Sequence, residues 1–311
     1  MGPVSRLHPI GPPTRTHAMS LLFPMTRRTG LLGAAAALLA GCSGAQTLDA
    51  LVPRGSYRGE VGIAYGADPR QRLDTYLPLH ADGATPLVVF FYGGSWTRGD
   101  RADYRFVGEA LAANGVACVI ADYRLSPQVH WREILADCAA ATRWAQLHAA
   151  DLGAAADRLL VMGHSAGAYN AAMLALDARW LTAVGSTPDT LAGWVGIAGP
   201  YDFLPIGDPE TRQAFGWPDT PLDSQPIAHV TAAAPPTLLL AGARDTVVDP
   251  RRNTEGLAAR LEQAHVPVEV RVFDRLNHAT SVGAIAAPLH WLAPVRDVVL
   301  AFVRTRRNGR A

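Results

Sequence analysis

The chain has 311 residues, a formal net charge of +1, 49% hydrophobic residues and 18% charged residues. This composition indicates a globular chain with a large core, long enough for one large α/β domain or two small ones. A charge near zero excludes an overall electrostatic footprint for nucleic acid or acidic membranes. All 28 basic residues are arginine, which excludes a P-loop lysine, a lysine Schiff base and a Ser-Lys dyad.

The N-terminal region has the pattern of an export signal. From Met25, the sequence MTRRTGLLGAAAALLAGCSG places two arginines before a short apolar run and then small residues. That order is typical of a secretory signal, and the run is too short to span a bilayer. We expect 25–41 to be a signal peptide and 42–57 a linker, with 1–24 either disordered or an overextended gene start. The alternative is a buried N-terminal helix.

The sequence LAGC at 39–42 resembles the bacterial lipobox. The resemblance implies lipidation of Cys42 and an exported lipoprotein of the cell envelope or periplasm, held at the membrane only through this anchor. Residues 26–32 also resemble a twin-arginine signal, so the choice between Sec and Tat export stays open. Cys118 and Cys138 lie in apolar segments and are interpreted as buried thiols, with pairing between them left open.

After the linker, short apolar runs alternate with longer amphipathic ones. Strands are expected at 58–66, 71–79, 86–94, 115–123, 158–163, 193–199, 236–242 and 267–273. Helices are expected at 102–114, 131–149, 166–177, 251–264 and 286–305. This alternation predicts a mostly parallel central sheet with helices on both faces, over residues 58–305. The segment 200–235, rich in Pro, Asp and aromatic residues, is either a small cap or a long connection.

The pentapeptide Gly163-His164-Ser165-Ala166-Gly167 lies between an expected strand and an expected helix. G-x-S-x-G in that context is typical of a nucleophile held on a sharp turn. The first N–H groups of the following helix favour developing negative charge, so Ala166 is a candidate oxyanion donor. A tight turn without chemistry is the alternative for Ser165.

A serine hydroxyl becomes a nucleophile when a base takes its proton, and in a chain without lysine that base is histidine. His278 directly follows the last expected strand, whereas His290 falls on an expected helix and is a weaker rival. His164 adjoins the serine, where side chains diverge at a sharp turn, so we expect it to line the substrate site.

The third member of a triad orients the imidazole. Asp245 follows the penultimate strand, and Asp249 is expected instead to cap the next helix. The resulting order of serine, aspartate and histidine is that of α/β-hydrolases. The glycine-rich sequence YGGSW at 92–96 follows another strand and is expected to supply the second oxyanion donor. Trp96 and Tyr201 are candidates for lining the substrate site.

Five stretches, VGIAYGADPRQRLDTYLP, FYGGSW, ADYRLSP, GHSAGA and LNHATSV, resemble the carboxylesterase branch of the α/β-hydrolases. That branch includes hormone-sensitive-lipase-like esterases and kynurenine-formamidase-like enzymes, and the similarity spans roughly 58–305. It implies an α/β-hydrolase fold with Ser165, Asp245 and His278 as the triad. It also implies oxyanion donors at Gly94, Ser95 and Ala166. The sequence differs from the family at Tyr92, where histidine is usual, and at Ser95, where glycine or alanine is common.

The resemblance implies a serine hydrolase of small or medium carboxylic esters, acting through an acyl-enzyme without metal or cofactor. An arylformamidase, which uses the same groups on a different leaving group, is the alternative. A surface lipoprotein that kept the fold and binds a partner is a third hypothesis.

Overall fold

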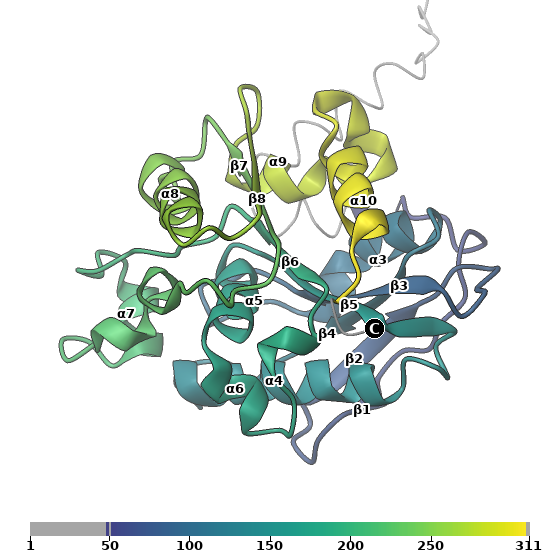
Figure 1. The fold of residues 1–311 in the computed structure, drawn as a ribbon, viewed down its shortest axis with the longest axis horizontal. Helices are drawn as coiled ribbons and strands as arrows, with labels where there is room; N and C mark the ends of the chain where they lie inside the picture. Colours follow the sequence, from purple (N-terminus) through teal and green to yellow (C-terminus); the bar gives the residue numbers. More distant parts are fainter. Residues whose placement is uncertain (1–47, 50, 309–311) are drawn as a thin grey trace, which may run out of the picture.

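An eight-stranded sheet crosses the centre of the computed structural model, which describes residues 48–49 and 51–308 (Figure 1). The strands are β1 (Ile63–Ala64), β2 (Arg72–Tyr76), β3 (Thr85–Phe91), β4 (Ala117–Ala121), β5 (Ala154–His164), β6 (Gly193–Ile197), β7 (Thr237–Gly242) and β8 (Val268–Phe273). Their order in the sheet is β1-β2-β4-β3-β5-β6-β7-β8. Strand β2 pairs antiparallel with β1 and β4, and the pairs from β4 to β8 are parallel.

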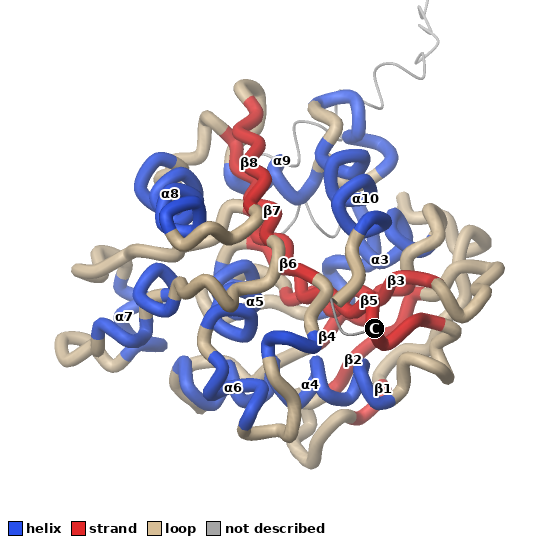
Figure 2. Tube along the Cα trace, in the orientation of Figure 1, coloured by secondary structure: helices blue, strands red, loops and turns tan. Residues whose placement is uncertain are grey.

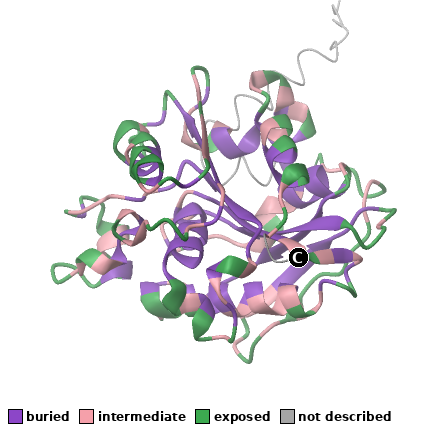
Figure 3. Ribbon diagram, viewed as in Figure 1, coloured by how far each residue is buried: buried purple, intermediate pink, exposed green. Residues whose placement is uncertain are grey.

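Helices cover both faces of this sheet. Within the described residues, the helices are α3 (Arg105–Ala112), α4 (Trp131–Leu147), α5 (Ala166–Leu176), α6 (Ala178–Thr182), α7 (Pro209–Phe215), α8 (Gly256–Gln263), α9 (His278–Gly283) and α10 (Val295–Thr305). Figures 1 and 2 show α3 and α10 on one side of the strands and α4, α5 and α6 on the other. Every residue of β3, β4, β6 and β7 is buried, as expected for parallel strands covered twice. Figure 3 shows this buried layer along the sheet, with exposed residues on the outer faces of the helices.

The strand order changes direction at β3, which lies between β4 and β5. The chain passes from β3 outward to β4 and then returns across β3 to β5. In open α/β sheets, ligands bind at such switch points, beyond the carboxyl ends of the strands. The loops that follow β3 and β5 therefore meet at the place where the fold favours a binding site.

Several expected elements differ in extent from the observed ones; β5, for example, spans Ala154–His164 where 158–163 is expected. Within 58–66 only Ile63–Ala64 is a strand, because the backbone at Gly62 has φ of +73° and turns the chain. The helix expected at 102–114 begins as the 3₁₀ turn η2 (Arg101–Tyr104), capped by Asp100, and continues as α3. Two other expected helices are each divided. The helix expected at 251–264 opens with the π-helical turn η6 (Arg251–Glu255) and continues as α8. The helix expected at 286–305 consists of the 3₁₀ turn η7 (Ala287–Leu292) and α10.

The segment 200–235 contains α7 and the two 3₁₀ turns η4 (Leu222–Ser224) and η5 (Pro226–His229). The expected signal peptide 25–41 and lipidation residue Cys42 lie outside the described residues. Within 48–49 and 51–308, no helix is long and apolar enough to cross a membrane. Cys118 and Cys138 are both buried free thiols.

Candidate active site

Ser165 stands at the junction of β5 and α5 in a strained backbone conformation, with φ of +55° and ψ of −122°. The flanking glycines permit this turn. A Cβ at Gly163 would lie 2.0 Å from the carbonyl oxygen of Gly167, and one at Gly167 would lie 2.0 Å from the carbonyl oxygen of Phe91. Non-glycine residues in such conformations cost about 1–3 kcal/mol and persist only where the surroundings hold them. The structure therefore explains both glycines of the G-x-S-x-G sequence.

His278 connects Ser165 to Asp245. Its Nε2 lies 2.8 Å from the Ser165 Oγ, and its Nδ1 lies 2.8 Å from an oxygen of Asp245. Since an ionised carboxylate only accepts hydrogen bonds, Nδ1 donates to Asp245 and Nε2 accepts from the serine hydroxyl. This is the tautomer that a base toward Ser165 requires.

The carboxylate of Asp245 has no solvent exposure, and its second oxygen accepts from the backbone N–H groups of Val247 and Val248 at 2.8 and 2.9 Å. Burial by itself raises the pKa of this carboxyl. The hydrogen bond and charge of His278 and the two N–H groups outweigh burial, so the pKa of Asp245 falls below its ordinary value. Asp245 therefore stays ionised at neutral pH, in the state that orients an imidazole.

His278 is the first residue of helix α9, where a connecting loop was expected. The side chain of Asn277 accepts from the N–H of Thr280 at 2.9 Å, and the Thr280 hydroxyl accepts from the N–H of Asn277 at 2.8 Å. This capping box fixes the start of the helix and with it the backbone of His278. Of the rival residues, His290 pairs with Asp297, and Asp249 accepts from the N–H of Arg251 at the start of η6.

His164 does not line the cavity beside Ser165, and that prediction is wrong. Its side chain is buried behind the site, and its Nε2 donates to the backbone carbonyl of His278 at 3.1 Å. The pKa of His164 is lowered to about 3, mainly by burial and to a smaller extent by charge repulsion from His278. The ring is therefore neutral, and its hydrogen bond helps to hold the backbone of His278 in place.

Tyr201 does not line the cavity either. Its side chain is fully buried, and its ring packs edge-on against Trp194 with 6.0 Å between the ring centroids. The reason is local: Gly196 and Gly199 leave the space that the Tyr201 side chain fills, since a Cβ at either position would lie within 2.5 Å of the Tyr201 hydroxyl oxygen. The aromatic residue that does reach the cavity from this segment is Phe203.

The loop at 92–99, here called the β3 loop, contains three consecutive residues with positive φ: Gly94 (+136°), Ser95 (+51°) and Trp96 (+60°). Ser95, Trp96, Ser165 and Ala166 line one cavity. Ala166 is the first residue of α5, so its N–H has no acceptor within the helix. Gly94 is not among the cavity residues; its carbonyl instead accepts from the N–H groups of Thr97 and Arg98.

The cavity has a volume of about 530 Å³. Its apolar side chains come from the β3 loop, the start of segment 200–235 and the residues after Asp245: Trp96, Pro200, Phe203, Pro205, Ile206, Val247 and Val248. Charged residues also line it: Arg98, Asp202, Asp208, Glu210, Asp249 and Arg252. Arg98 pairs with Glu210 and Arg252 with Asp202, so ion pairs join the β3 loop and η6 to segment 200–235. In the described part of the chain, no three His, Cys, Asp or Glu side chains are grouped to hold a metal ion.

Asn170 of α5 is a residue that sequence reasoning missed. It is fully buried, and its Oδ1 accepts from the Trp96 Nε1 at 3.0 Å. This bond ties the strained β3 loop to the helix that begins after Ser165. Its position five residues after Ser165 gives no signal, because helix residues share a face when they are three or four positions apart.

The BD-FAE family model matches residues 73–261, which is more than half of the chain. The chain belongs to the BD-FAE family. This BD-FAE chain is 31% identical over 207 residues to esterase LipC from Mycobacterium tuberculosis, covering 60% of this chain and 51% of LipC. It is 29% identical over 262 residues to LipM of the same organism, a probable carboxylic ester hydrolase, covering 76% of this chain and 60% of LipM.

A probable isoprenylcysteine alpha-carbonyl methylesterase from Arabidopsis thaliana is 26% identical over 239 residues, covering 70% of this chain and 50% of that protein. The BD-FAE chain thus spans about half to three fifths of the length of these relatives. Among solved structures, inhibited esterase B from Lactobacillus rhamnosis has a TM-score of 0.71 at 23% identity, with 89% of this chain and 95% of that one covered. Propionate-bound esterase 2 from Thermogutta terrifontis has a TM-score of 0.64 at 22% identity, with coverage of 79% and 94%. The predicted α/β-hydrolase fold is confirmed.

Proposed function

We propose that this chain is a serine hydrolase of carboxylic esters. The observation that carries the proposal is the pair of 2.8 Å contacts through which His278 joins Ser165 to Asp245. Ser165 Oγ attacks the ester carbonyl while His278 takes its proton, and the imidazolium then protonates the departing alcohol. Water attacks the resulting acyl-enzyme with the same histidine as base, which releases the acid and restores the serine. Asp245 holds the ring and stabilises its charged form.

The negative oxygen of the tetrahedral intermediate needs donors already in place. We assign this role to the backbone N–H of Ala166 and to one from the β3 loop at Ser95. The support is that both residues line the cavity beside Ser165 and that Ala166 opens helix α5. Removing one such donor typically lowers kcat by about 10² to 10³. Gly94 contributes to this arrangement through its backbone conformation, because a Cβ there would lie 2.1 Å from the carbonyl oxygen of Arg98.

A cavity of about 530 Å³ with an apolar wall suits a small or medium acyl ester. The names of LipC, LipM and the plant methylesterase support ester hydrolysis as the reaction. A kynurenine formamidase from Salmo salar is also similar, at 28% identity over 153 residues, covering 49% of this chain and 50% of that protein. Formamide hydrolysis is therefore the outcome against which the ester proposal is tested.

The test compares p-nitrophenyl esters of increasing acyl length with N-formylkynurenine, using wild type and Ser165→Ala. We expect short and medium esters to have the highest kcat/KM and Ser165→Ala to lose about six orders of magnitude in turnover. A higher kcat/KM for N-formylkynurenine would refute the ester assignment in favour of the formamidase. Failure of a fluorophosphonate to label wild type, while it labels a control esterase, would favour a non-catalytic lipoprotein.

We also propose that the chain is a lipoprotein of the cell envelope, anchored through Cys42. The support is the lipobox-like sequence LAGC after the apolar run. Expression in a bacterial host with radiolabelled palmitate should label wild type and leave Cys42→Ala unlabelled. Equal labelling of both proteins, or of neither, would refute the anchor without affecting the catalytic proposal.

A further inference from the structure

We propose that Tyr92, Arg70 and Asp122 form a clamp that holds both ends of the β3 loop and thereby sets the position of its oxyanion donor. The inference rests on the proposed ester hydrolysis and deepens it, because these residues act on the reaction through the loop. None of the three lines the substrate cavity. They are therefore positioning residues rather than catalytic ones.

The first end of the loop is held at Tyr92, whose side chain is fully buried. Its hydroxyl donates to an oxygen of Asp122 at 2.9 Å and accepts from the Arg70 Nη2 at 2.7 Å. Its backbone carbonyl accepts from the hydroxyl of Tyr123 at 2.8 Å, and the two rings stack with centroids 4.7 Å apart. Both the side chain and the backbone of the first loop residue are thus fixed.

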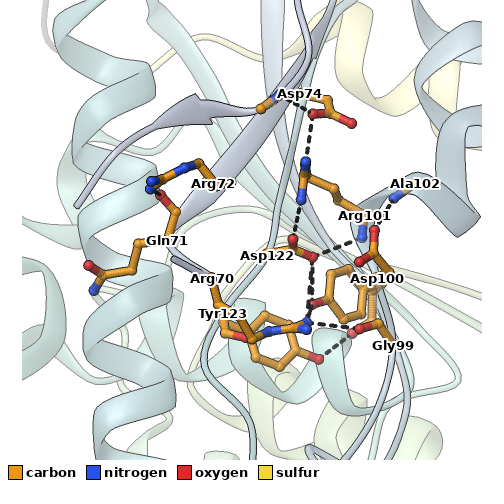
Figure 4. Close-up of polar contacts among 12 residues, drawn as sticks. Arg70, Gln71, Arg72, Asp74, Gly99, Asp100, Arg101, Ala102, Asp122 and Tyr123 are labelled. Atoms are coloured by element: carbon orange, nitrogen blue, oxygen red, sulfur yellow. Dashed lines mark hydrogen bonds and ion pairs between the residues drawn. The ribbon is translucent and has the colours of Figure 1, made fainter. Parts of the chain in front are cut away.

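The other end of the loop is held by the same residues. The Arg70 Nη2 donates to the carbonyl oxygen of Gly99 at 2.8 Å, and the N–H of Arg101 donates to Asp122 at 2.9 Å. Figure 4 shows Asp122 between Arg70 and Arg101, with Gly99 beside Arg70. Gly99 has φ of +114°, and a Cβ there would lie 2.6 Å from the ring of Tyr92, so the two ends also touch directly. One arginine and one aspartate therefore set the span of the loop.

The clamp would keep the middle of the β3 loop in a strained backbone conformation. Between its ends, Ser95 and Trp96 keep positive φ values that a free loop of these residues would abandon. Asp122 is itself held by an ion pair with Arg101, which in turn donates to Asp74 of β2 at 2.7 Å. The loop is thereby tied to the antiparallel end of the sheet. The carboxylates of Asp74 and Asp122 are both buried and both bonded to Arg101, which suits a positioning role.

The test uses Tyr92→Phe, which removes one hydroxyl from the clamp and keeps the ring. Tyr76→Phe is the matched control, since the Tyr76 side chain is also buried and its ring packs against Tyr57, away from the loop. We expect Tyr92→Phe to lower kcat for a p-nitrophenyl ester about tenfold with KM nearly unchanged, because an oxyanion donor acts mainly in the transition state. A trifluoromethyl ketone, which forms a tetrahedral adduct with serine, should bind more weakly by the same factor. Tyr76→Phe should change neither quantity.

A second pair of variants replaces arginine. Arg70→Met removes the bonds to Tyr92 and Gly99, whereas Arg72→Met removes bonds from Arg72 to the backbone carbonyls of Gln71 and Asp68, away from the loop. Arg72 points away from the clamp in Figure 4. We expect Arg70→Met alone to lower kcat. In the double variant with Tyr92→Phe, the combined loss should be smaller than the product of the single losses, because both act through one loop.

The outcomes separate the two proposals. A wild type without ester hydrolysis overturns the proposed function and the clamp together. An active wild type in which Tyr92→Phe and Arg70→Met match their controls in kcat overturns the clamp and leaves the proposed function standing. A loss that appears in KM with kcat unchanged, or losses that multiply independently, also overturns it.

Discussion

Lowering the pH should destabilise this protein through His164, and a single substitution should remove that effect. His164 is buried against the backbone of His278, and its pKa falls from 6.5 to about 3 on folding. The folded state thus holds the neutral ring at pH values where the unfolded state binds a proton. The stabilisation is complete above the unfolded pKa and is lost as the pH falls from about 6.5 toward 3.

The size of the effect follows from the pKa difference. Each pH unit below the unfolded pKa costs about 1.4 kcal/mol in the free energy of unfolding. At pH 5 the protein should have lost about 2 kcal/mol relative to pH 8 through His164 alone. In His164→Gln, the amide can still donate to the His278 carbonyl, and no proton is taken up. The same change of pH should therefore destabilise this variant by about 2 kcal/mol less.

The assay is urea unfolding at pH 8 and pH 5, for wild type, His164→Gln and His80→Gln, which replaces an exposed histidine. Comparing variants cancels the contributions of the other titrating groups. The reasoning is refuted if wild type and His164→Gln lose equal stability between the two pH values. It is also refuted if His80→Gln reduces the loss as much as His164→Gln does.

Three further predictions concern the turn and the triad. Ser165→Gly should be inactive but about 1 kcal/mol more stable to urea than Ser165→Ala, because glycine relieves the positive φ; equal stabilities would contradict strain at this residue. Gly167→Ala should lower the free energy of unfolding by about 3 kcal/mol through the clash with the Phe91 carbonyl, which thermal unfolding would detect. Asp245→Asn should lower kcat about 10⁴-fold, since an amide cannot stabilise the His278 imidazolium, and ester kinetics with an unchanged kcat would exclude that role.

The sheet and the meeting of Ser165, Asp245 and His278 were predictable because their signals are local. Apolar runs bounded by glycines mark the parallel strands, and G-x-S-x-G combines the nucleophile with the turn that presents it. Asp245 and His278 each follow a strand, and parallel strands bring their carboxyl ends to one edge of a sheet. Chain order and strand ends therefore sufficed to bring Ser165 together with its two partners.

The residues around this group of three were not predictable in the same way. His164 directly precedes Ser165 in the sequence, yet its side chain is hydrogen-bonded to the backbone carbonyl of His278. That contact depends on where α9 begins. Tyr201 turns inward because the glycines of β6 and of the loop after it leave a space for its side chain. Arg70 and Asp122 are far apart in the chain and meet because the strands beside them, β2 and β4, are neighbours in the sheet. Such contacts follow from strand register and helix placement, which no short sequence pattern encodes.

Backbone strain in this molecule is concentrated at the carboxyl ends of three neighbouring strands. Four of the five non-glycine residues with positive φ in the described ranges lie there: Ser95 and Trp96 after β3, Ser165 after β5 and Ala198 after β6. Each costs stability, and each persists because the ends of its segment are bonded elsewhere, as in the N–H of Ser165 to the Ile197 carbonyl at 2.9 Å. Three of these residues, Ser95, Trp96 and Ser165, line one cavity. The hydrogen bonds of the sheet therefore hold the backbone around Ser165 in a geometry that an unconstrained chain would not keep.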